Sequence, residues 1–92
     1  MAITIKLPTQ LRASAGGESA VSVDSSATVA DALEKLYEQH PGLRASLSNE
    51  DGTLRRFVNV YVGGEDIRFG DGLETAITDG AELQILPAVA GG

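Results

Sequence analysis

Residues 57–64 read Phe57-Val58-Asn59-Val60-Tyr61-Val62-Gly63-Gly64 and hold the clearest strand pattern of the chain. β-branched and aromatic residues dominate the strand, and a glycine pair directly after it is typical of a hairpin turn. Because side chains alternate along a strand, the valines fall on one side and Phe57, Asn59 and Tyr61 on the other. We expect the valines to face a helix.

An amphipathic segment earlier in the chain supplies that helix. Thr28 is suited to cap the first turn, with Asp31 three residues later, and Pro41-Gly42 ends the pattern. The side chains that share one face at helical spacing are Val29, Leu33, Leu36, Tyr37 and His40. The spacing predicts one helix beginning at Thr28, and His40 is expected to pack or to cap its end.

Further strands are predicted near both ends of the chain. Residues 2–7 alternate in polarity, and residues 18–23 follow them after a loop over residues 8–17. Residues 82–86 form the last strand, with Leu83 and Ile85 inward. We expect Pro87 to end its pairing, because proline has no N–H to donate.

Two shorter elements complete the order. Residues 43–47 suggest a short helical turn, and Ile67 with Phe69 suggests a brief strand. The order is then strand, strand, helix, strand, short strand, strand. This order matches an α+β fold of the β-grasp (ubiquitin-like) type, with a mixed sheet and one main helix on one face.

Composition excludes several classes of protein. The chain has 92 residues and no cysteine, so we expect one small domain without disulfides, thiolate metal sites or iron–sulfur clusters. No apolar run approaches the roughly 20 residues of a membrane helix, and the first residues lack the layout of a secretory signal. We predict a cytoplasmic protein with no membrane partner.

Negative charge is concentrated in the last third of the chain. The net charge is −6, and residues 63–92 carry six acidic residues against Arg68 alone. The acidic residues are Glu65, Asp66, Asp71, Glu74, Asp79 and Glu82. This balance disfavours nucleic acid and favours a basic docking site on a protein partner. The alternative is a solvated acidic surface that only aids solubility.

The residue constellations of common enzymes are missing from the sequence. The chain has no cysteine and a single histidine, so no Cys–His or multi-histidine site can be assembled, and we expect packing or helix capping rather than a Ser–His–Asp triad for His40. Gly63-Gly64 lacks the flanking residues of a phosphate loop, and Glu65, Asp66 and Asp71 lack the spacing of a calcium loop. We predict that the chain is not an enzyme and binds no metal or cofactor.

The sequence ends in Pro87-Ala88-Val89-Ala90-Gly91-Gly92. We predict a domain over residues 1–87 and a flexible tail over residues 88–92 that ends in a reactive carboxylate. A carboxylate is a poor electrophile, so a partner would first use ATP to make an acyl-adenylate, which a sulfur or nitrogen nucleophile attacks. Terminal glycines minimise bulk at that carbon, where small displacements cost rate. A frayed or artificially added Gly-Gly end is the alternative.

Several segments together resemble a known family. They are the strand 57–62, the Gly-Gly-Glu-Asp-Ile-Arg-Phe segment 63–69, the turn Asp79-Gly80 and the ending 86–92. They are similar to the ubiquitin-like sulfur carriers of the ThiS and MoaD group, and most of all to the CysO type. The resemblance implies that a ubiquitin-activating-type enzyme adenylates Gly92, next to Gly91, at the expense of ATP.

The same resemblance implies the chemistry after adenylation. A sulfur donor (a rhodanese-type protein or sulfide) converts the adenylate to a thiocarboxylate, and a biosynthetic enzyme accepts the sulfur. That acceptor is a cysteine synthase for CysO-type members, whereas other members serve molybdopterin or thiazole synthesis. Two other interpretations stay open: a protein modifier joined to lysines through Gly92, and a permanent small subunit of an enzyme such as molybdopterin synthase.

The alternation of the strands also indicates where partners dock. Phe57, Tyr61 and Leu86 fall on the side away from the helix, near the tail. An exposed aromatic and aliphatic patch of this kind is typical of an interface. We predict that these three residues, with Pro87, Ala88, Val89 and Ala90, bind the activating enzyme together with the acidic residues 65–82. The alternative is that the loop 43–56 folds over the patch.

Overall fold

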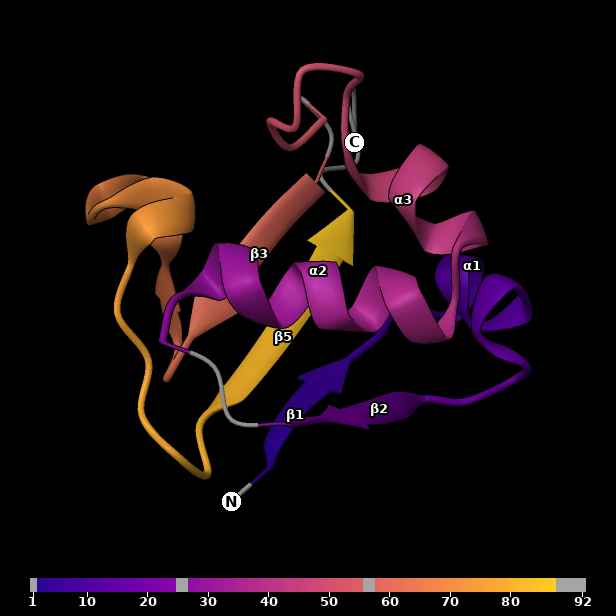
Figure 1. The fold of residues 1–92 in the computed structure, drawn as a ribbon, viewed down its shortest axis with the longest axis horizontal. Helices are drawn as coiled ribbons and strands as arrows, with labels where there is room; N and C mark the ends of the chain where they lie inside the picture. Colours follow the sequence, from indigo (N-terminus) through magenta and orange to yellow (C-terminus); the bar gives the residue numbers. More distant parts are fainter. Residues whose placement is uncertain (1, 25–26, 56–57, 88–92) are drawn as a thin grey trace.

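The structure is a computed structural model, and it describes residues 2–24, 27–55 and 58–87. Within these residues, five strands form one sheet in the order β2-β1-β5-β3-β4 (Figure 1). The strands are β1 (Ile3–Lys6), β2 (Ala20–Val23), β3 (Val58–Val62), β4 (Glu65–Asp66) and β5 (Glu82–Pro87). β5 runs parallel to β1 and antiparallel to β3, so the sheet is mixed and its last strand is central.

The helices are α1 (Thr9–Arg12), α2 (Val29–Gln39) and α3 (Gly42–Leu47), with three 3₁₀ turns η1 (Ala13–Ala15), η2 (Ile67–Phe69) and η3 (Gly72–Glu74). α2 lies across one face of the sheet (Figure 1). It begins as predicted, because Thr28 Oγ1 accepts a hydrogen bond from the Asp31 N–H at 3.2 Å. It ends with His40 at the C-cap position, where the backbone N–H of His40 donates to the Leu36 carbonyl at 2.9 Å.

The core fills the space between α2 and the sheet. Fully buried apolar side chains come from both layers, including Ile3, Ile5, Leu83 and Ile85 of the sheet and Val29, Leu33 and Leu36 of α2. Val58 and Val60 are buried on the same side, as the alternation predicts, and Val62 packs at the margin. Burying one such side chain stabilises the fold by about 1.5–3 kcal/mol, so this layer supplies most of the driving force.

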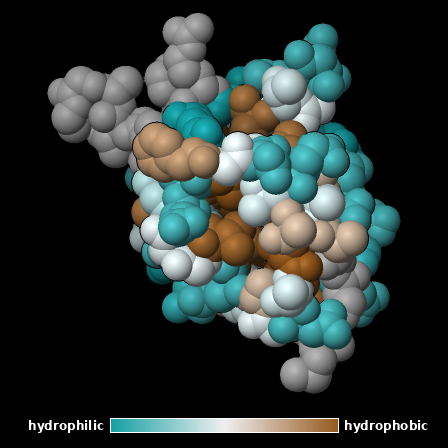
Figure 2. Space-filling model, turned by 90° about the vertical axis from the view of Figure 1, so that its left-hand side faces the viewer, coloured by the Kyte–Doolittle hydropathy of each residue, from teal (hydrophilic) through white to brown (hydrophobic). Residues whose placement is uncertain are grey.

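At one flank the core comes close to the surface. Leu54, Val58, Val60, Ile67 and Leu73 line a hollow of about 290 Å³ between β3 and the 3₁₀ turns. Figure 2 shows this flank, with apolar side chains gathered at its hollowed centre and polar ones around them. Val58 and Val60 of β3 therefore lie in a part of the core that is open to the surface at this flank.

The segment 8–17 differs from the prediction of a loop, because it forms α1 and η1. Leu11 packs against the core and Ala15 is fully buried, so the segment has an apolar side that a helical conformation buries. Gly16 ends it at φ 66°, in the left-handed region that glycine adopts without a Cβ clash. The pattern is too short for its period to be recognised in the sequence.

The brief strand predicted at Ile67 and Phe69 is also wrong. The short strand is Glu65–Asp66, and Ile67–Phe69 forms η2. Asp66 Oδ1 accepts a hydrogen bond from the Arg68 N–H at 2.8 Å and so caps this turn. Ile67 is buried whereas Phe69 is 91% exposed, although a strand would place the two side chains on one side.

Smaller differences concern strand ends. The second strand begins at Ala20 rather than Glu18. Pairing of β5 extends to Pro87, opposite Val58, because proline is tolerated at the end of a strand. Within the described ranges, none of the helices combines the length and the apolar character needed to cross a membrane.

Candidate functional site on the open face of the sheet

The face of the sheet opposite α2 carries the candidate site. Its residues alternate with the core residues along each strand, and the register sets their neighbours. Asn59 lies opposite Leu86, and Tyr61 lies opposite Gln84. Gln84 in turn pairs with Lys6 of β1. Polar and aromatic side chains thus form continuous rows across strands that are far apart in the sequence.

The structure places two of the predicted partner-binding residues together on this open face. Tyr61 is half-buried and Leu86 is 37% exposed, and they are diagonal neighbours because Tyr61 pairs with the residue two before Leu86. α3, within the segment 43–56, packs against α2 and η1, so it leaves Leu86 exposed. Pro87 is the last residue of β5. The remaining predicted site residues lie outside the described residues: Phe57, Ala88, Val89, Ala90, Gly91 and Gly92.

Asn59 is an unusual neighbour for Leu86. Its Oδ1 atom is buried and has no hydrogen-bond partner among the described residues. A buried acceptor without a donor costs about 1–3 kcal/mol relative to a satisfied one. The alternation of the strand predicted this face for Asn59 but indicated no role for it. Asn59 lies opposite Leu86 in the row of residues on the open face.

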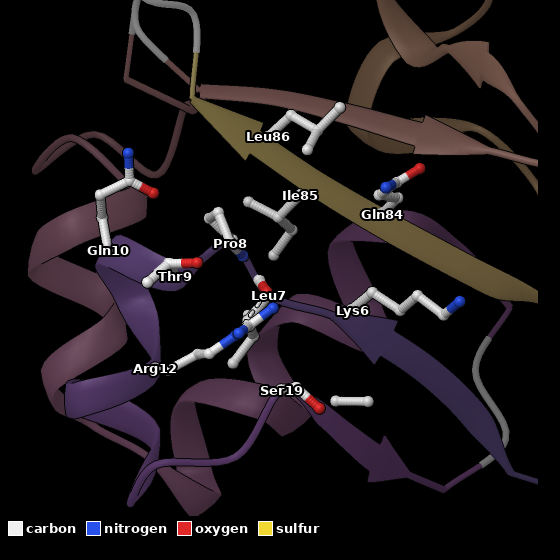
Figure 3. A pocket seen from close by; sticks show the side chains of 11 residues that line it. Lys6, Leu7, Pro8, Thr9, Gln10, Arg12, Ser19, Gln84, Ile85 and Leu86 are labelled. Carbon is white, nitrogen blue, oxygen red and sulfur yellow. Dashed lines mark hydrogen bonds between the residues drawn. The ribbon is translucent and has the colours of Figure 1, made fainter.

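A hollow of about 550 Å³ opens where β5 approaches its end (Figure 3). Its lining includes Gln84 and Leu86 of β5, Lys6 of β1, and Pro8 and Arg12 around α1. Arg12 Nε donates to the Leu7 carbonyl at 3.3 Å, which holds the guanidinium against the end of β1. Sequence reasoning missed this hollow because the residues after Leu7 were expected to form a loop, and only a helix brings Arg12 back to the sheet.

A second hollow, of about 410 Å³, lies at the β4 edge of the sheet. It is lined by Tyr61, Gly64, Glu65, Asp66 and Phe69. Phe69 was expected in a strand, whereas η2 turns its ring outward to 91% exposure. The acidic segment singled out in the sequence thus contributes two carboxylates next to two aromatic rings.

The titratable groups with shifted pKa lie elsewhere, around α3 and the turn that follows it. Burial raises the pKa of Tyr37, whose hydroxyl shares a 2.7 Å hydrogen bond with Ser48 Oγ. The Arg44 guanidinium lies 4.8 Å from the centre of the Tyr37 ring. Hydrogen bonds from Thr53 lower the pKa of Asp51. These contacts stabilise the helical layer and lie away from the open face of the sheet.

Known proteins are similar to this chain in sequence and in fold. The family model described as ThiS family matches residues 5–92. The chain belongs to the ThiS family. It is 45% identical over 94 residues to the sulfur carrier protein CysO of Mycobacterium tuberculosis, and the alignment covers 100% of both chains. The resemblance seen in the sequence is therefore confirmed.

Two solved structures are similar to this chain in fold and in sequence. A chain in the crystal structure of the Amycolatopsis orientalis BexX/CysO complex has a TM-score of 0.90 and 47% identity, covering 99% of this chain and 100% of that one. Small archaeal modifier protein 1 of Haloferax volcanii has a TM-score of 0.84 and 36% identity, covering 96% of this chain and 98% of that one. The β-grasp prediction is confirmed.

The relatives define the class of protein. The full-length likeness to CysO supports a sulfur-carrier role for this ThiS-family chain. Such proteins are small ubiquitin-like carriers rather than catalysts. The BexX/CysO complex also supports partner enzymes of the sulfur-transfer kind.

Proposed function

We propose that this ThiS-family protein carries sulfur as a thiocarboxylate on Gly92. The observation that carries the proposal is the full-length identity of 45% with the sulfur carrier CysO. The match to the family extends through residue 92 and so includes the Gly91-Gly92 ending. The described domain accounts for recognition, and the Gly92 carboxylate accounts for the chemistry.

The chemistry takes two steps, both on a partner enzyme. A carboxylate oxygen of Gly92 attacks the α-phosphorus of ATP, pyrophosphate leaves, and an acyl-adenylate forms. Sulfide (HS⁻) then attacks the acyl carbon, AMP leaves with the carboxylate oxygen that joined it to the chain, and the sulfur loses its proton to solvent. The product is a thiocarboxylate, whose sulfur is a nucleophile that the recipient enzyme uses. The absence of cysteine from the sequence is compatible with sulfur held on the terminal carbonyl.

The activating enzyme docks on the open face in this proposal. Tyr61 and Leu86 present partly exposed apolar surface there. Leu86 and Pro87 end the central strand β5, so a protein bound to this face lies next to the start of the tail. We assign the sulfur to a cysteine synthase-type acceptor, because the CysO chains compared above, at 45% and 47% identity, are of the type for which the resemblance implies this acceptor.

Mass spectrometry tests the carrier function directly. The chain is incubated with ATP, sulfide and a ubiquitin-activating-type enzyme, and then analysed intact and as fragments. We expect replacement of one oxygen by sulfur, localised to Gly92 and absent from a chain that lacks Gly92. An unchanged mass, obtained with an enzyme that loads another carrier in parallel, would contradict the proposal.

A protein modifier is the second candidate function. The likeness to small archaeal modifier protein 1 favours it, at 36% identity over nearly the whole chain. The activation step is the same, and a lysine amine replaces the sulfur nucleophile. Lysine-linked conjugates of the chain in cells, lost when Gly92 is removed, would identify this function.

A further inference from the structure

One row of side chains crosses the open face with opposite charges at its two ends. The register aligns Asp66 with Tyr61, Tyr61 with Gln84, and Gln84 with Lys6. Neighbouring strands lie about 4.8 Å apart, so the three steps from β4 to β1 span about 14 Å. The β4 end carries the hollow of Glu65 and Phe69, and the β1 end carries the hollow that Arg12 lines.

The β4 hollow has the chemistry of a site for a cationic side chain. An aromatic ring face attracts an ammonium or guanidinium group, and carboxylates bind it by charge-assisted hydrogen bonds. Phe69 is 91% exposed, and Tyr61, Glu65 and Asp66 line the same hollow. Arg68 does not line it, and its Nη2 donates to the Val58 carbonyl at 3.0 Å. Among the described residues, the lining of this hollow therefore carries carboxylates and no cation.

The hollow at the β1 end has the opposite character. Within the described part of the chain its lining contains Lys6 and Arg12 and no carboxylate, although the net charge of the protein is −6. Arg12 donates through Nε to the Leu7 carbonyl, which leaves the N–H groups of its two Nη atoms to bind an anion. Lys6 pairs with Glu82 at 3.2 Å, but both side chains are more than half exposed, and such pairs are weak.

We propose that the enzyme activating this carrier docks in one orientation fixed by these two hollows. An arginine or lysine of the enzyme enters the hollow between Phe69 and Tyr61, and an aspartate or glutamate enters the hollow beside Arg12. The inference rests on the proposed function. The reversed orientation places like charges together at both ends, which opposes binding. Because Leu86 lines the Arg12 hollow, this polarity fixes which side of the enzyme lies at the end of β5.

Charge reversal with matched controls tests the orientation. Arg12→Glu and Glu65→Lys alter the two hollows, and Phe69→Ala removes the exposed ring without altering charge. Lys35→Glu and Glu38→Lys in α2, in the layer on the other side of the sheet, change the net charge by the same amounts. Each purified protein is tested by ATP–pyrophosphate exchange with an activating enzyme that accepts the unaltered chain, at low and high salt.

We expect each site variant to raise the half-saturating carrier concentration by about tenfold or more, with little change in the maximal rate. The loss for the two charge reversals should shrink in high salt, because salt screens exposed charges. Equal effects of the site variants and the α2 controls would show a response to net charge alone and would overturn the inference. So would site variants that behave like the unaltered chain.

A second measurement separates this inference from the proposed function. Amide resonances of the labelled chain are followed while acetyl-arginine amide or acetyl-glutamate amide is added. Shifts at Gly64 to Phe69 with the arginine probe, and at Lys6 to Arg12 with the glutamate probe, support the two hollows even if no enzyme adenylates the chain. The same response to both probes overturns the opposite charge preferences of the two hollows. Failed adenylation refutes the proposed function, and the probe responses then show whether the two hollows still discriminate by charge.

Discussion

The two faces of the sheet are built from the same strands and have different roles. On the α2 side, Ile85 is 1% exposed among other buried apolar side chains. On the open side, its chain neighbour Leu86 is 37% exposed beside Asn59 and Tyr61. Adjacent residues of β5 therefore differ in burial, because Ile85 belongs to the core whereas Leu86 is exposed on the face proposed for docking.

The largest effect is expected at this step, where the two faces differ most. Ile85→Ala leaves a cavity in the core and should lower the free energy of unfolding by about 3 kcal/mol, whereas Leu86→Ala should lower it by less than about 1 kcal/mol. Urea denaturation followed by circular dichroism measures both. Similar losses for the two variants would show that the open face carries as much of the stability as the core.

The next effect is expected in binding rather than stability. The double variant Tyr61→Ala, Leu86→Ala removes the apolar part of the open face. It should remain folded, while the half-saturating concentration for adenylation rises by about tenfold or more. Circular dichroism and ATP–pyrophosphate exchange give the two values. A folded double variant that is adenylated at the normal rate would refute docking on this face.

A smaller loss of stability is expected on the helical side. Tyr37→Phe removes the hydroxyl that is hydrogen-bonded to Ser48 Oγ at 2.7 Å, within a buried region. We expect the free energy of unfolding to fall by about 1 kcal/mol, because the Ser48 hydroxyl loses its partner. Urea denaturation near neutral pH measures the change, and Tyr61→Phe on the open face is the matched control. Equal losses of unfolding free energy in Tyr37→Phe and Tyr61→Phe would contradict the distinction between the two faces of the sheet.

The same residue gives a pH dependence. Burial raises the pKa of Tyr37 above its ordinary value of about 10, so the folded state keeps a proton that the unfolded state releases. The corresponding stability is complete below about pH 10 and is lost as the pH rises through the folded pKa. The free energy of unfolding should therefore fall less steeply above about pH 10 in Tyr37→Phe than in the unaltered chain. The same dependence of unfolding free energy on pH in both proteins would contradict a raised pKa of Tyr37.

The smallest effect concerns the unsatisfied acceptor on the open face. Asn59→Val replaces an amide whose buried Oδ1 has no described partner with a residue that favours strands. Stability should stay equal or rise by up to about 1 kcal/mol, because no hydrogen bond is lost. Urea denaturation measures the change. A loss of more than about 1 kcal/mol would show that the amide has a partner in the folded chain.

The parts of the fold predicted from sequence are those set by near neighbours. Thr28 caps α2 through a hydrogen bond that spans three residues, and the alternation of β3 places Val58 and Val60 inward. The predictions were wrong for residues 8–17 and 67–69, which form short turns of helix. Their conformation depends on the packing of Leu11, Ala15 and Ile67 into a core that distant strands form.

Patterns within the sequence were enough to indicate three things. They indicated the family, through the ending of the chain; the alternation of the strands; and the placement of Tyr61 and Leu86 on one face. The position of β5 between β1 and β3, which aligns Lys6, Gln84, Tyr61 and Asp66 in one row, came only from the folded chain. So did the outward turn of Phe69 beside Glu65 and the return of Arg12 to the end of the sheet. The difference is one of range, because periodicity and caps act over a few residues, whereas the neighbours across a sheet depend on which distant segments pair.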